Sequence, residues 1–95
     1  MKAIIWNKSG WIKETNPNNL KLFFNDALKK SGFGILKFSD HHFKPFGYSA
    51  IWLISESHFA IHTFPEEKKT YWEISSCSKS KFNSFIKNIK KPKGL

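Results

Sequence analysis

The segment that most constrains the fold is residues 54–66, which places two serines, two histidines and two glutamates among apolar residues. The preceding run, residues 48–54, is nearly all apolar and predicts a central strand. Residues 57–63 alternate, which predicts a further strand with two distinct faces. One face would carry Ser57, Phe59 and Ile61, and the other His58, Ala60 and His62. Polar groups concentrated in such strands indicate a site rather than a plain core.

Two helices flank the predicted strands. The first has apolar residues at helical spacing, which form one stripe. These residues are Leu20, Phe23, Phe24, Ala27 and Leu28. Asn16 suits the N-cap, Pro17 the first helical position and Gly32 the residue just past the end. The second helix would begin after the N-cap Ser78 and repeat the same spacing. Its apolar residues are Phe82, Phe85, Ile86 and Ile89.

Shorter patterns complete the order of elements. Residues 2–6 predict a first strand or hairpin, with turn residues at 7–10, and residues 33–39 predict a strand followed by a loop at 40–47. After a turn at Lys68 and Lys69, residues 70–77 alternate, with Tyr71, Glu73, Ser75 and Cys77 on one face. This order predicts an α+β domain, a mainly antiparallel sheet with two helices packed on one face.

Length and composition limit the class of protein. A chain of 95 residues forms one domain with a modest core, so association with a second copy would add stability. No apolar run of about 18 residues is present, which excludes a membrane span. The single cysteine, Cys77, fits a reducing compartment, and we expect a cytoplasmic protein without a signal peptide.

The formal charge of +9 raises the question of a phosphate-bearing partner. Many lysines lie within residues 79–93, where they indicate the solvated side of a helix and lack interleaved aromatic residues. We therefore expect neither nucleic acid nor membrane as a partner. A metal site is not expected either, because His58 and His62 have no cysteine or acidic residue at fitting spacing.

Several spaced motifs resemble one known family. They are Phe43-Lys44-Pro45-Phe46-Gly47-Tyr48-Ser49, Ile54-Ser55-Glu56-Ser57-His58, Ile61-His62-Thr63-Phe64-Pro65-Glu66, and Cys77 before a helix. Together they closely resemble the prokaryotic S-adenosylmethionine decarboxylase proenzymes, which depend on a pyruvoyl group. The resemblance covers about residues 41–78, and the flanking helices agree in order.

The resemblance implies that the chain cuts itself between Glu56 and Ser57. The Ser57 hydroxyl would attack the carbonyl of Glu56, Ser49 would help hold the tetrahedral intermediate, and His62 would take the α-proton of residue 57. Residues 1–56 would become the β chain, and residues 57–95 an α chain that begins with pyruvoyl. This group would replace pyridoxal phosphate as the electron sink, because its ketone forms a Schiff base with the substrate.

The same resemblance assigns the remaining roles. Cys77 would be the proton donor, Phe43 would stack on adenine, and Glu66 would accept hydrogen bonds from the ribose hydroxyls. The product would be the aminopropyl donor for spermidine biosynthesis. The family also implies a small-molecule substrate and a homodimer or larger assembly of processed αβ protomers.

Two alternatives remain open. Relatives with this framework act on ornithine or arginine, and a non-catalytic basic binding module could keep the fold without activity. Each residue also has a plainer explanation outside the motif. A lone cysteine such as Cys77 is usually a small buried hydrophobe, and a strand histidine such as His62 is usually structural.

Overall fold

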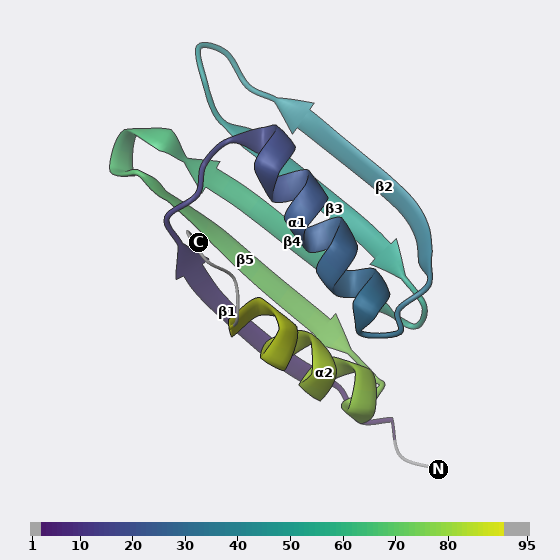
Figure 1. The fold of residues 1–95 in the computed structure, drawn as a ribbon. Helices are drawn as coiled ribbons and strands as arrows, with labels where there is room; N and C mark the ends of the chain where they lie inside the picture. The colour runs from purple at the N-terminus through teal and green to yellow at the C-terminus, as the bar shows by residue number, and fades with distance from the viewer. Residues whose placement is uncertain (1–2, 91–95) are drawn as a thin grey trace.

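The computed structural model describes residues 3–90, whose strands form one five-stranded sheet (Figure 1). Its order is β1-β5-β4-β3-β2, and every neighbouring pair is antiparallel. The strands are β1 (Trp6–Ile12), β2 (Ile35–His42), β3 (Tyr48–Ile54), β4 (Ser57–Phe64) and β5 (Lys69–Ser76). Helices α1 (Pro17–Lys30) and α2 (Lys79–Lys90) cover one face of the sheet, and a 3-10 turn, η1 (Pro65–Glu67), links β4 to β5. The predicted α+β architecture is confirmed.

Helix α1 begins and ends as its sequence predicts. The Asn16 side chain accepts a hydrogen bond from the Asn19 backbone N–H at 3.1 Å, and Pro17 occupies the first helical position. Ser31 is the C-cap, and Gly32 follows it at φ +93°, a left-handed conformation that glycine adopts without strain. These two ends fix the length of the helix.

The core lies between the helices and the sheet and is mainly aromatic. The ring of Phe59 lies 4.7 Å from that of Phe24, 5.2 Å from that of Phe85 and 5.4 Å from that of Trp52. Phe59, Phe24, Phe85 and Trp52 are fully buried. Aromatic side chains remove about 150–250 Å² each from water, so this cluster supplies much of the drive to fold.

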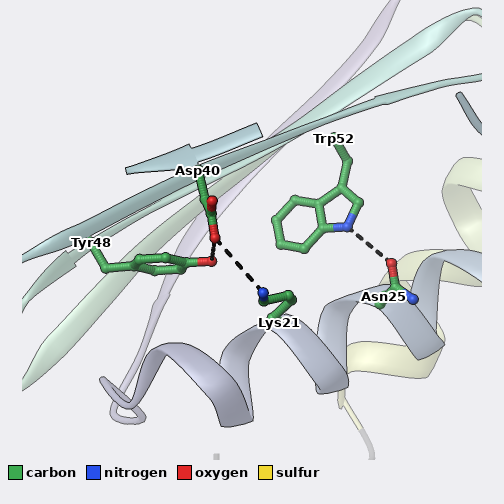
Figure 2. Close-up of polar contacts among 5 residues, drawn as sticks. All are labelled: Lys21, Asn25, Asp40, Tyr48 and Trp52. Atoms are coloured by element: carbon green, nitrogen blue, oxygen red, sulfur yellow. Dashed lines mark hydrogen bonds and ion pairs between the residues drawn. The ribbon is translucent and has the colours of Figure 1, made fainter. Parts of the chain in front are cut away.

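Polar contacts tie α1 to strands β2 and β3 (Figure 2). The Tyr48 hydroxyl donates to Asp40 at 2.7 Å, and the Lys21 ammonium lies 3.8 Å from the same carboxylate. The Trp52 indole N–H donates to the Asn25 side chain at 3.2 Å. Burial, together with the hydrogen bond and charge of Asp40, raises the pKa of Tyr48 well above its ordinary value. The phenol therefore stays protonated and keeps donating.

The predicted turn at residues 7–10 is wrong, because these residues lie within β1. Each of them pairs with a residue of β5, and Gly10 lies opposite Trp72. A Cβ atom on Gly10 would lie only 2.8 Å from the Trp72 ring, so glycine at this position leaves the space that the indole fills. Pairing with β5 thus outweighs the local turn preference. Residues 3–5 precede the strand, and Lys2 lies outside the described residues.

Two further boundaries differ from expectation. Residues 40–42 belong to β2 rather than to a loop, because Asp40, His41 and His42 pair with successive residues of β3. Lys69 begins β5, so the turn is made by η1 together with Lys68, which has φ +55°. Cys77 lies one position beyond β5 instead of within it. No helix within residues 3–90 has the length and apolar character needed to cross a membrane.

Candidate active site

The turn between β3 and β4 consists of Ser55 and Glu56, with Ile54 and Ser57 paired across it. Glu56 has φ +55°, in the left-handed region that side chains other than glycine seldom adopt. Such a conformation costs about 1–2 kcal/mol. The peptide bond between Glu56 and Ser57 therefore directly follows a strained residue in an exposed turn.

The end of β5 lies against this turn. Ser76 is the register partner of Ser57, and the Ser57 hydroxyl donates to the Ser76 hydroxyl at 2.8 Å. The next residue, Cys77, is exposed, and its Sγ lies 3.1 Å from the carbonyl oxygen of Glu56. The thiol is thus placed to donate a hydrogen bond to that oxygen when negative charge develops on it.

A second polar group lies at the opposite end of the sheet. Ser49 Oγ and His62 Nδ1 lie 2.7 Å apart, and the imidazole stacks on Tyr71 with ring centroids 6.4 Å apart. These contacts orient the histidine ring on the face of the sheet that the helices leave uncovered, the helix-free face. The ring borders an open depression of about 440 Å³, which Glu73 also lines. The Tyr71 hydroxyl in turn donates to Glu73 at 2.9 Å.

Phe43 follows β2 and Glu66 follows β4 in the chain. The two connections leave the sheet at the end where β3 begins (Figure 1), which is also the end that holds the paired residues Ser49 and His62. The Phe43 ring is half exposed and contacts His41 edge-on, with centroids 4.6 Å apart. Phe43 and Pro65 line one cavity of about 370 Å³. Glu66 is exposed in η1, next to Pro65. An exposed ring and a free carboxylate near one cavity suit recognition of a nucleoside.

The predicted site residues thus form two separate groups within one chain. The turn group is Glu56, Ser57 and Cys77; the face group is Ser49, His62, Phe43 and Glu66. Ser57 and His62 are both in β4, five positions apart, which corresponds to about 16 Å along a strand. Their side chains also point to opposite faces of the sheet. One chain alone does not bring the two groups within reach of each other.

The contact of Ser76 with Ser57 is one that the sequence patterns do not predict. The place of Ser76 in the alternating pattern predicts only that it shares a face with Trp72 and Ile74. The contact with Ser57 depends on the register between β4 and β5, for which the sequence carries no direct signal. Within residues 3–90, no cluster of three or more histidine, cysteine or acidic residues is arranged to bind a metal ion.

The fold and the site define a small α+β protein with a strained, serine-containing turn beside an exposed cysteine. The family model for S-adenosylmethionine decarboxylase matches residues 10–92. The chain therefore belongs to the S-adenosylmethionine decarboxylase family, which confirms the resemblance seen in the motifs.

Individual relatives agree. The chain is 33% identical over 75 residues to the S-adenosylmethionine decarboxylase proenzyme of Thermodesulfovibrio yellowstonii, covering 73% of this chain and 56% of the relative. It is 44% identical over 54 residues to the proenzyme of a Geobacillus species, covering 57% of this chain and 44% of that one. The chain thus spans about half the length of the curated relatives it matches.

A solved structure supports the fold. The crystal structure of the adenosylmethionine decarboxylase from Aquifex aeolicus superposes with a TM-score of 0.77, covering 94% of this chain and 79% of that chain. The sequence identity is 18%, so this likeness shows the fold alone.

Proposed function

We propose that this chain is a self-cleaving proenzyme that forms a pyruvoyl group from Ser57 and decarboxylates S-adenosylmethionine. Family membership and relatives described as proenzymes support the proposal. The observation that carries it is the turn itself, where the Cys77 thiol lies 3.1 Å from the carbonyl of a positive-φ Glu56. A single free cysteine also suits a reducing compartment, and we place the protein in the cytoplasm.

The cutting reaction begins at Ser57. Its Oγ bonds to the carbonyl carbon of Glu56, the carbon–nitrogen bond breaks, and the hydroxyl proton passes to the freed amine, which leaves an ester. Removal of the α-proton of residue 57 expels the Glu56 carboxylate and leaves a dehydroalanine. Tautomerisation and addition of one water then release ammonia and leave the pyruvoyl ketone. The strain of Glu56 favours this direction, because cutting frees the turn.

A pyruvoyl group at residue 57 supplies a ketone that accepts the electron pair left as carbon dioxide departs. Cys77 is exposed beside this position and would return a proton to the substrate carbon. Phe43 would stack on the adenine, and Glu66 would accept hydrogen bonds from the ribose. The product would be the aminopropyl donor for spermidine biosynthesis.

A complete site requires two copies of the chain. The Ser49–His62 pair lies about 16 Å along β4 from its own Ser57, whereas proton transfer needs atoms about 3 Å apart. In a two-fold dimer, one copy contacts the other with the same surface, so each face group can serve the partner's turn group. Each dimer would then contain two complete sites.

The helix-free face is where we place the second copy. It exposes about half of the side chains of Ile51, Leu53 and Trp11. Within residues 3–90, no element covers this face of the sheet (Figure 1). Burial of these apolar side chains would favour association. This contact would also cover the depression beside His62.

Release of carbon dioxide from S-adenosylmethionine, ornithine and arginine tests the activity. We expect release from S-adenosylmethionine only, and none from the Ser57→Ala chain, which has no precursor of the ketone. Release from ornithine or arginine alone would reassign the substrate. A chain that cuts itself but acts on none of the three would refute the substrate class. A folded chain that never cuts would favour a non-catalytic basic module.

A further inference from the structure

We propose that Ser76 is the positioning residue for self-cleavage, because it orients the Ser57 hydroxyl for attack on Glu56. The inference rests on the proposed function and extends it to a residue that has no assigned role. Ser76 is 1% exposed, and its Oγ accepts the Ser57 hydroxyl at 2.8 Å. The contact joins two residues that are register partners in β4 and β5.

The hydrogen bonds of Ser76 are fully assigned. Its Oγ accepts from the Ser57 hydroxyl and, at 3.0 Å, from the Ser78 backbone N–H. Its own proton is directed to the Ser78 carbonyl oxygen at 3.4 Å. A serine hydroxyl has one donor and two acceptor lone pairs, so these contacts use all three. Ser76 therefore has one stable orientation, and it offers Ser57 a fixed acceptor.

The start of α2 anchors this arrangement. The Ser78 carbonyl also accepts the backbone N–H of Phe82 at 2.9 Å, the first hydrogen bond of the helix. Phe82 and Phe85 are buried in the core, so the helix start is packed in place. A series of contacts thus runs from the core through helix α2, Ser78 and Ser76 to Ser57. A rigid element thus sets the position of the nucleophile.

The chemical consequence lies at Ser57. With its proton directed to Ser76, the Ser57 oxygen keeps its lone pairs free for the carbonyl carbon of Glu56. On attack, the new oxygen–carbon bond forms, the carbon–nitrogen bond breaks, and the proton ends on the amine nitrogen of residue 57. Ser76 gains and loses no atom. Without it, the Ser57 side chain would sample three staggered rotamers and lose one hydrogen bond, which together predict cutting about 10- to 30-fold slower.

The first test compares two isosteric substitutions, Ser76→Thr and Ser76→Val. Both have the same shape, so packing changes equally, but only threonine keeps the hydroxyl. Freshly synthesised chains are followed by intact mass over time. Ser76→Thr should cut within about threefold of the parent rate, and Ser76→Val about 10- to 30-fold more slowly. Ser80→Ala, exposed on α2 and outside both groups of site residues, should cut at the parent rate. Equal rates for Ser76→Thr and Ser76→Val would overturn the proposal.

A second test separates positioning from support of the fold. The Ser57→Cys chain has a thiol nucleophile, which donates only weakly to Ser76. Hydroxylamine cleaves both the ester and the thioester, so it reports the first step in either chain. Ser76→Ala should slow the first step in the Ser57 chain and change it little in the Ser57→Cys chain. The same loss in both chains would assign Ser76 to folding alone. An uncut parent chain would instead refute the proposed function, whatever Ser76 does.

Discussion

Two inactive variants should restore cutting when their chains are mixed. The Ser57→Ala chain lacks the nucleophile but keeps the Ser49–His62 pair, and the His62→Ala chain has the reverse defect. The pair lies about 16 Å from the Ser57 of its own chain, beyond the reach of proton transfer. A mixed dimer therefore contains one complete site, made of Ser57 from one copy and His62 from the other.

The expected yield follows from random pairing. About half of the His62→Ala chains would have a Ser57→Ala partner, so about half should be cut. No Ser57→Ala chain should be cut in any pairing. The assay is intact mass after co-expression of the two variants with tags of different mass, and each variant alone is the control. An uncut mixture in which mixed dimers are shown to form would refute the two-copy site. Cutting of the His62→Ala chain alone at the parent rate would remove the role of His62.

Three further predictions follow from single contacts. Cys77→Ala should slow cutting about tenfold, because a weak donor to the Glu56 carbonyl is lost, and it should abolish carbon dioxide release. If a Cys77→Ser chain cuts no faster than the Cys77→Ala chain, the hydrogen-bond donor at this position is irrelevant to cutting. In the uncut Ser57→Ala chain, Glu56→Gly should raise the free energy of unfolding by about 0.5–1 kcal/mol, because glycine relieves the left-handed strain, and Glu56→Ala should not raise it. Urea titrations measure both values, and equal values would argue against strain at Glu56. Tyr48→Phe should cost about 1 kcal/mol at neutral pH. Because the pKa of Tyr48 is raised in the folded chain, the contribution of Tyr48 to the free energy of unfolding is complete below about pH 10 and declines above it. The Tyr48→Phe chain should therefore lose less stability in alkali than the parent chain. Curves of stability against pH that run parallel for the two chains would contradict this.

Local patterns predicted the elements that are decided locally. The stripe and caps of α1 and the apolar run of β3 each depend on neighbouring residues, and the structure confirms their positions. Residues 7–10 and 40–42 were misassigned because their conformation depends on pairing with distant strands. Turn residues can lie in a strand when a partner supplies their hydrogen bonds.

The division of the site was partly predictable. Ser57 and His62 lie five positions apart in one predicted strand, and that spacing alone implies about 16 Å between them. The contacts at the turn were not predictable in the same way. Ser76 and Cys77 reach Ser57 and Glu56 only through the register of β4 with β5, which depends on packing across the whole sheet.

The central claim is that the chain makes its own ketone by cutting its backbone at Ser57, and intact mass of the natively purified chain tests it most directly. The account predicts two fragments, residues 1–56 and residues 57–95. The second should be about 17 Da lighter than its sequence, the mass of one ammonia, because pyruvoyl replaces serine. A single uncut mass from a folded sample, or a second fragment that begins with ordinary serine, would contradict the account.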